Sequence, residues 1–173
     1  LMKIGLDCWR DVAAHAKSRG LSFVFWEPMS VGRELGHTIA ACQALQNWID
    51  AAQLPLPFKP MVDIDHGDVT SADPDDTDPY AWARRFATQS PIIHIKQSTM
   101  NKGGHWPFTA QYNADGRITP EKLLGAVKAG GGTDNELCLE LAFREREPTD
   151  RNVVAAVRDS VAFWAPYTKT GFN

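Results

Sequence analysis

The sequence predicts an α/β fold with parallel strands, and three observations support this prediction. Short apolar segments alternate with amphipathic helical segments along the 173 residues, so each strand is followed by a helix. Neither the G-x-G-x-x-G pattern of dinucleotide-binding folds nor the pattern of phosphate-binding loops follows a strand. The remaining parallel architecture is the (β/α)8 TIM barrel of ~250 residues. We therefore expect a single domain, 1–173, that supplies four strand–helix units, half of such a barrel.

The first half of the chain contains two helices and two strands. Apolar residues at helical spacing predict a helix over 4–16, and Gly20 is typical of the position just past a helix end. Segment 21–27 is short, aromatic and β-branched, as expected of a buried strand. A second helix is predicted over 38–52 and a second strand over 58–64.

The second half repeats the alternation. An acidic, turn-rich loop over 68–78 precedes a helix that starts with Pro79, and a Gly- and Asn-rich stretch over 97–117 is predicted to be a long loop. The other predicted elements are, in order, helix 79–88, strand 91–96, a helix from 119 that ends in glycines 130–132, strand 136–143 and helix 150–164.

Polar side chains lie at the end of each predicted strand. They are Glu27, then Asp63, Asp65 and His66, then His94 and Lys96, and finally Glu140. Strands buried on both faces should be almost wholly apolar, and a buried carboxylate without a partner is costly. Taken alone, such an Asp or His is more often a loop anchor. Because the carboxyl ends of barrel strands form the face where active sites are built, four in succession indicate a divalent-metal site.

The same residues resemble the ligand set of the xylose isomerase-like barrel family of sugar isomerases and epimerases, which includes the ketose 3-epimerases. The resemblance covers nearly the whole chain and matches the last four strand–helix units of that barrel. It implies Glu27, Asp63, His94 and Glu140 as metal ligands, with Asp65 as an alternative to Asp63, and His66 as a substrate-contacting histidine. Hard, mostly carboxylate ligands favour Mn²⁺ or Mg²⁺, with Co²⁺ as an alternative.

The expected reaction is proton transfer in a small ketose through a metal-bound enediolate. Glu27 and Glu140 would remove and return the proton, while His66 and Lys96 hold substrate oxygens. Two facing bases would give epimerisation, and one shuttling base would give aldose–ketose isomerisation.

Segment 27–34 resembles a sugar-phosphate branch of the family, the tetrulose-phosphate epimerases. Arg33 and Lys102 could bind the phosphate, although Arg33 could instead pair only with Glu34 or the acidic loop. The Arg that the sugar 3-epimerases carry after the third ligand is absent, so Lys102 or His105 would replace it. Trp26, Trp106 and Phe108 are expected near the substrate, because they flank the polar residues.

Charge and composition exclude several classes of protein. Eighteen basic and 21 acidic residues give a net charge of −3, which does not favour nucleic acid as a partner. No apolar run reaches the ~18 residues that span a membrane. Three distant cysteines offer neither a disulfide framework nor a zinc motif, so we expect a cytoplasmic protein.

The chain opens inside a helical pattern, so we expect either a missing N-terminal half or a homo-oligomer that completes the barrel. Two alternative functions remain: an abasic-site endonuclease-like metal hydrolase on the same fold, and a non-catalytic half-barrel that binds a sugar.

Overall fold

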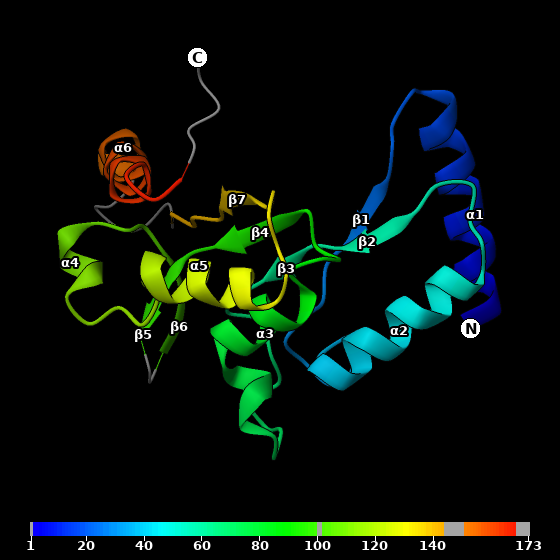
Figure 1. Cartoon of the computed structure of the whole chain (residues 1–173), viewed down its shortest axis with the longest axis horizontal. Helices are drawn as coiled ribbons and strands as arrows, with labels where there is room; N and C mark the ends of the chain where they lie inside the picture. Colours follow the sequence, from blue (N-terminus) through cyan, green and yellow to red (C-terminus); the bar gives the residue numbers. More distant parts are fainter. Residues whose placement is uncertain (1, 100–101, 144–150, 169–173) are drawn as a thin grey trace.

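The structure, a computed structural model, describes residues 2–99, 102–143 and 151–168. Helices and strands alternate along the chain, and Figure 1 shows α1 and α2 at one end and α4 and α6 at the other. The helices are α1 (Met2–Ser18), α2 (Ile39–Ala51), η1 (Pro74–Thr77), α3 (Pro79–Phe86), α4 (Ala110–Asn113), α5 (Pro120–Ala129) and α6 (Val153–Trp164). The strands are β1 (Val24–Trp26), β2 (Phe58–Pro60), β3 (Val62–Asp63), β4 (Ile92–Ile95), β5 (Gln97–Thr99), β6 (Lys102–Trp106) and β7 (Glu136–Leu139).

The strand pairs β1–β2, β3–β4 and β4–β7 are all parallel, which confirms the predicted α/β class. Asp63 lies opposite His94, and His94 lies opposite Cys138 two residues before Glu140. Parallel pairing places the carboxyl ends of these strands at a common edge. The polar residues that end the strands are therefore neighbours in space.

The predicted strand over 58–64 is divided into β2 and β3 at Met61. Pro60 has no N–H to donate, and the N–H of Val62 donates to the hydroxyl of Ser90, 3.0 Å away, rather than to a strand. The Ser90 hydroxyl in turn donates to the carbonyl of Ile92 at 2.6 Å. One side chain thus bridges β3 and β4 where the regular ladder is interrupted.

The predicted long loop over 97–117 is wrong. Strands β5 and β6 form an antiparallel hairpin in which Gln97 lies opposite Trp106, and helix α4 follows. Gly103 and Gly104 have low strand propensity and hide the hairpin in the sequence. Gly104 is required here because a Cβ at this position would lie 2.7 Å from the Trp106 ring, which folds back over it.

Two large apolar clusters hold the helices on the strands, together with a smaller one in which Trp82 and Phe86 of α3 pack against Val62 of β3. The first packs α1 and α2 against β2 and includes Ala13, Leu45 and Phe58. The larger second cluster joins β4 to α5 and α6 and includes Ile93, Leu123 and Trp164, as well as Phe108, whose ring stacks on Phe163. These clusters fix the strands whose ends carry the polar residues. The predicted start of the last helix, Asp150, lies outside the described residues.

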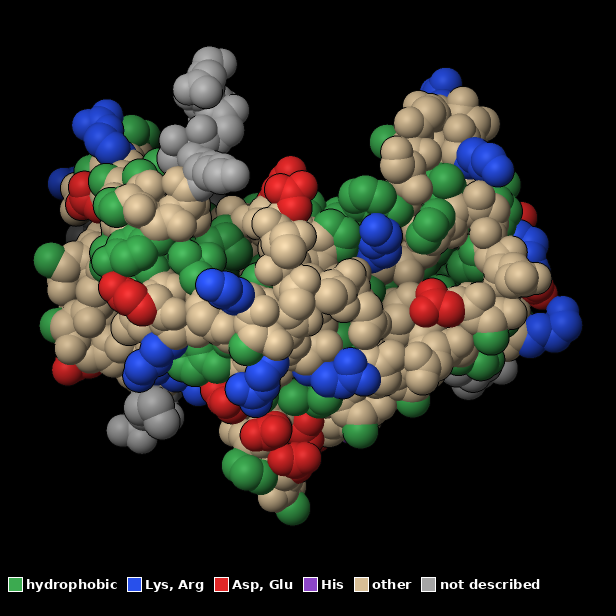
Figure 2. Space-filling view, viewed as in Figure 1, with side chains coloured by type: hydrophobic (Ala, Val, Ile, Leu, Met, Phe, Trp, Pro, Cys, Tyr) green, Lys and Arg blue, Asp and Glu red, His purple; other side chains and the backbone are tan. Residues whose placement is uncertain are grey.

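The acidic loop over 68–78 contains η1 and forms the lower tip in Figure 2, where acidic side chains gather. Asp76 departs from the expectation of a solvated turn. It is buried, and its Oδ1 accepts the N–H of Ile39 at the start of α2, 2.7 Å away. Across the described segments, no helix has both the length and the apolar character to span a bilayer.

Candidate functional site

Three of the four predicted metal ligands meet directly at the strand ends. Nδ1 of His94 lies 3.4 Å from Oε1 of Glu27 and 3.6 Å from Oε2 of Glu140. Glu27 follows β1, His94 lies in β4 and Glu140 follows β7. The fourth residue, Asp63, ends β3 and joins this group through Lys96. The structure therefore gathers all four predicted ligands at one edge of the strands.

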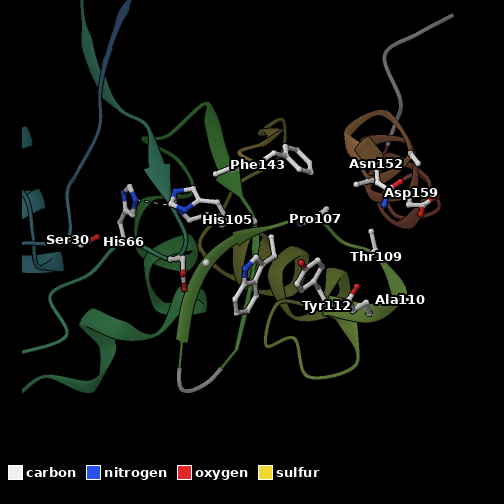
Figure 3. Close-up of a pocket in the computed structure, with 18 residues that line it drawn as sticks. Ser30, His66, His105, Pro107, Thr109, Ala110, Tyr112, Phe143, Asn152 and Asp159 are labelled. Atoms are coloured by element: carbon white, nitrogen blue, oxygen red, sulfur yellow. Dashed lines mark hydrogen bonds between the residues drawn. The ribbon is translucent and has the colours of Figure 1, made fainter. Parts of the chain in front are cut away.

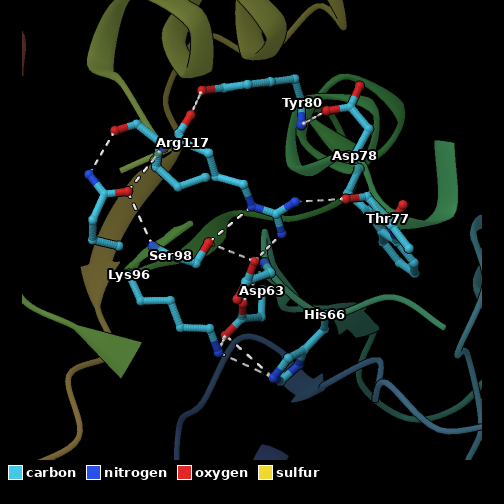
Figure 4. Close-up of polar contacts among 12 residues, drawn as sticks. Asp63, His66, Thr77, Asp78, Tyr80, Lys96, Ser98 and Arg117 are labelled. Carbon is cyan, nitrogen blue, oxygen red and sulfur yellow. Dashed lines mark hydrogen bonds and ion pairs between the residues drawn. The ribbon is translucent and has the colours of Figure 1, made fainter. Parts of the chain in front are cut away.

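Lys96 lies at the centre of the polar cluster, and its side chain is only 1% exposed. Its ammonium donates to Oδ2 of Asp63 at 2.6 Å and to Oε2 of Glu140 at 3.1 Å. Nζ also lies 2.9 Å from Nε2 of His105 and 3.3 Å from Nε2 of His66. Figure 4 shows the lysine reaching Asp63 and His66. A residue expected to hold substrate oxygens thus also binds the cluster together.

His66 is oriented by its two ring nitrogens. Nδ1 lies 3.1 Å from the carbonyl oxygen of Pro28, which can only accept, so Nδ1 carries a proton. Burial and the neighbouring Lys96 ammonium lower the pKa of His66. The imidazole is then neutral at pH 7, and Nε2 is free to accept a hydrogen bond from Lys96.

The pKa values of Asp63 and Glu140 are shifted in opposite directions beside their common partner, Lys96. Burial, followed by the hydrogen bond with Glu140, raises the pKa of Asp63 to about 8. Burial also disfavours ionised Glu140, but hydrogen bonds with Asp63 and Lys96 outweigh it and lower the pKa of Glu140 to about 2. We assign the proton to Asp63 because its carboxyl is the more deeply buried of the two. At neutral pH the two carboxyls therefore carry about one negative charge, balanced by Lys96.

Asp65, the alternative ligand, has other partners. Its carboxylate pairs with the guanidinium of Arg117 and accepts the hydroxyl of Ser98 at 2.9 Å. Arg117 also donates from Nε to Ser98 and from Nη1 to the carbonyl of Thr77, as Figure 4 shows. Sequence reasoning missed this network because Arg117 lies 52 residues from Asp65 in a segment predicted to be a loop.

Two groups of side chains could hold a metal ion. One consists of Glu27, Asp63, His66 and Glu140, and the other of His66, His105 and Glu140, with the donor atoms of each group within 4.8 Å of one another. The sequence expected His94 in this role, but neither group includes it. Within the described part of the chain, Oε1 of Glu27 and Nδ1 of His94 are buried without hydrogen bonds, so both atoms could accept a further partner.

A divalent ion would meet Lys96 at the same place. The carboxylate and imidazole donors suit such an ion chemically. However, Oδ2 of Asp63 and Oε2 of Glu140 are both already hydrogen-bonded to the ammonium. A cation placed between these oxygens would contact another positive charge in a buried setting. The described arrangement therefore does not fit a divalent ion while Lys96 stays in place.

A cavity of about 720 Å³ opens beside the cluster (Figure 3). His66 and His105 line one end together with Lys96, which contacts both histidines, while Asn152 and Asp159 line the end next to α6. Between them the rings of Trp106 and Tyr112 stack at 5.4 Å. Sequence reasoning placed Trp106 near substrate but missed Tyr112, because α4 lies in the predicted loop.

Two predicted substrate residues lie away from the cluster. Trp26 precedes Glu27, and because side chains alternate along a strand it points the other way, with its indole N–H donating to Gln46 of α2 at 2.8 Å. Arg33 is 85% exposed, and its Nε lies 3.8 Å from Oε1 of Glu34, the alternative left open by the sequence. The side chain of Lys102, at the start of β6, lies outside the described part of the structure.

Comparisons with known proteins confirm the family resemblance. The chain is 63% identical over 171 residues to D-erythrulose 1-phosphate 3-epimerase of Brucella abortus, a match that covers 99% of this chain and 55% of the relative. The chain thus spans about half the length of the curated relative that it matches. No family model matches the chain.

Two solved structures share the fold. One is described as a putative xylose isomerase from Rhodospirillum rubrum, with a TM-score of 0.79, 24% identity, and coverage of 97% of this chain and 55% of that one. The other is an AP endonuclease, family 2, from Brucella melitensis, with a TM-score of 0.50, 13% identity, and coverage of 95% and 53%. At these identities the likeness concerns the fold alone.

Proposed function

We propose that the protein containing this chain, a relative of the xylose isomerase-like sugar epimerases, epimerises a small ketose phosphate. The observation that carries this proposal is the pair of carboxylates, Glu27 and Glu140, that approach His94 from different strands. The first substrate to test is D-erythrulose 1-phosphate, because the relative at 63% identity is a 3-epimerase of that name.

Epimerisation requires one group to remove a proton and another to return one on the opposite face of the carbon. We assign the removal to Glu27, whose Oε1 is buried without a hydrogen bond. The proton shared by Glu140 and Asp63 is returned from the other side. The net result is an inverted carbon and one proton moved from the Asp63–Glu140 pair to Glu27. Exchange with water then resets the enzyme.

Removal of the proton leaves negative charge on the substrate's carbonyl and hydroxyl oxygens. His66 and Lys96 are the hydrogen-bonding groups of the cluster that also line the cavity, together with His105. Oriented donors in a partly buried site stabilise such charge more strongly than water does. We assign Lys96 and neutral His66 to these oxygens, while the ion pairs with Asp63 and Glu140 fix the position of the ammonium.

The residues that we propose to bind the phosphate are those that the sequence predicts. They are Arg33 and Lys102, and the exposed side chain of Arg33 has the freedom to move toward a bound phosphate. The sequence also predicts a bound ion, Mn²⁺ or Mg²⁺. The position of Lys96 between Asp63 and Glu140 does not fit such an ion, and metal analysis of the purified protein tests these opposing expectations.

A deuterium-exchange experiment tests the proposed reaction. The protein is incubated with D-erythrulose 1-phosphate in D₂O, and proton NMR follows the hydrogen at C3. We expect that signal to disappear while the C3 epimer forms, and we expect neither change with the Glu27→Gln variant. A ketose phosphate that keeps its C3 proton for as long as the enzyme-free control would contradict the proposal and favour a non-catalytic sugar-binding role.

We also propose that the 173-residue chain alone is not an active monomer. Among the described strands, β1 pairs only with β2 and β7 only with β4, so each has an unpaired edge. Further strands, from a longer protein or from a second copy, would cover these edges. Sedimentation and activity of the isolated chain test this, since an active 19.2 kDa monomer would contradict it.

A further inference from the structure

We infer that Lys96 is the resident cation of this site, so that its ammonium takes the place of a divalent metal. This inference rests on the proposed function for the chemistry it serves, but the position of Lys96 can be tested without substrate. It departs from the metal dependence that the sequence predicts, and it follows from where the lysine lies relative to the carboxylates.

The first argument is geometric. A metal held by Asp63 and Glu140 must lie within bonding distance of one oxygen from each. Nζ of Lys96 already lies 2.6 Å from Oδ2 of Asp63 and 3.1 Å from Oε2 of Glu140. It therefore occupies the space between the two oxygens that a bridging ion would need.

The second argument concerns charge. A divalent ion is held best by carboxylates that are both ionised, whereas a single ammonium balances one negative charge. The Lys96 ammonium already pairs with both Asp63 and Glu140, at 2.6 and 3.1 Å. A divalent ion between these oxygens would lie beside that buried positive charge. The ammonium is almost completely buried and has no route to leave the site without separating its two ion pairs.

The third argument is access to the substrate. The cavity is lined by Lys96 and by the two histidines that contact it, His66 and His105. An ammonium has three N–H groups, and here it faces four acceptors, namely Asp63, Glu140, His66 and His105. A substrate oxygen can therefore replace the longest contact, at 3.3 Å to His66, while the two ion pairs stay intact.

Metal binding by the protein, measured without substrate, tests the inference. Wild type, Lys96→Met and Lys96→Gln are stripped with EDTA and dialysed against MnCl₂, and metal content and melting temperature are then measured. We expect wild type to retain no stoichiometric Mn²⁺ and to melt at the same temperature with or without it. At least one of the Lys96 variants should retain about one Mn²⁺ per chain and gain thermal stability, because Asp63 and Glu140 are released to bind it.

A matched control is Lys128→Met, which removes an exposed lysine from α5 and should behave as wild type. Stoichiometric Mn²⁺ in the wild type would overturn the inference. It would also be overturned if both Lys96 variants fold, as judged by a cooperative melting transition in EDTA, and neither binds the metal. If neither variant folds, the wild-type measurement alone decides.

Measurements of epimerase activity test the inference independently. If the inference holds, EDTA leaves the epimerisation rate of the wild type unchanged and added Mn²⁺ changes it less than twofold, whereas the Lys96 variants lose about 10²–10³-fold in kcat. Metal stimulation above tenfold would overturn the inference. A protein with no turnover of any ketose phosphate would contradict the proposed function instead, and the Mn²⁺ measurements would still judge Lys96.

Discussion

Asp63 and Asp65 are two buried aspartates two residues apart, and their surroundings differ in the cation that each one faces. Asp65 faces Arg117, whose planar guanidinium divides its donors among Asp65, Ser98 and Thr77. Asp63 faces Lys96, whose ammonium has three N–H groups but four hydrogen-bond acceptors around it. Arg117 donates to three separate partners and Asp65 also lines the cavity, whereas Lys96 has one acceptor more than it has N–H groups. A carboxylate's role in this protein is thus set by its cation.

The largest expected effect is the loss of activity in Glu27→Gln, a variant in the lysine cluster. The amide cannot accept the substrate proton, so we expect kcat to fall about 10²–10⁴-fold. The melting temperature should change little, because Oε1 of Glu27 makes no hydrogen bond within the described residues. Steady-state kinetics and thermal melting measure the two quantities, and a kcat within fivefold of wild type would remove Glu27 from the reaction.

Removal of Arg117 from its network should lower the free energy of unfolding. Arg117→Met leaves the Asp65 carboxylate buried without its cation, and we expect the free energy of unfolding to fall by about 3–5 kcal/mol. Urea denaturation measures this loss. Adding Asp65→Asn should recover part of it, and the exposed Arg158→Met should stay within about 0.5 kcal/mol of wild type. A loss below 1 kcal/mol would mean that the two cations differ less than the geometry indicates.

Arg33 extends the comparison to an exposed cation. Its contact with Glu34 contributes little to stability at this exposure, so Arg33→Ala should not change the melting temperature. If Arg33 binds the phosphate, loss of a charge-assisted hydrogen bond of about 1.5–3 kcal/mol should raise KM for the phosphorylated ketose roughly 10- to 100-fold. KM for the dephosphorylated ketose is the control, and an equal change for both sugars would exclude a phosphate contact.

The last effect concerns pH and is small for each pH unit. The pKa of Asp63 is about 8 in the folded protein and near 3.8 when exposed, so the folded state keeps a proton that the unfolded chain releases. This contribution to stability is complete below pH 4 and declines as the pH rises toward 8. The lowered pKa of Glu140 acts only below about pH 4.5, outside this window.

We therefore expect the free energy of unfolding to fall between pH 5 and pH 8, by at most about 1.4 kcal/mol per pH unit. The decline should be shallower in Asp63→Asn, because the amide does not titrate. Urea denaturation at four pH values makes the measurement. A wild type whose stability rises over this range would show that Asp63 is ionised beside Lys96.

Sequence patterns predicted the strand ends well because parallel strands bring their carboxyl ends together whatever the exact register. Glu27, His94 and Glu140 meet as expected, and Asp63 rather than Asp65 faces them. The role of Lys96 was not predictable, since it depends on which of several nearby acids its long side chain reaches. Trp26 was predicted to lie near the substrate together with Glu27. Side chains alternate along a strand, however, so the side chains of these two adjacent residues point in opposite directions.

The hairpin β5–β6 was not predicted from the sequence, for a different reason. Its glycines lack the β-branched and aromatic side chains by which strands are recognised, and its pairing is set by Trp106 folding back over Gly104. As a consequence His105, a contact of Lys96, arises from a segment that the sequence assigns to a loop. Tertiary contacts, rather than local propensity, decide the structure of that stretch.

The interruption between β2 and β3 has a consequence for the curvature of the sheet. A sheet that closes on itself must bend across its strands, and a continuous ladder of backbone hydrogen bonds resists such bending. Here Pro60 has no N–H to donate and the Ser90 hydroxyl accepts the N–H of Val62, so the backbone can change direction without leaving Val62 unpaired. The Ser90 hydroxyl therefore holds β3 and β4 together at this bend. The position of Asp63 in the site thus depends on a serine that has no part in the chemistry.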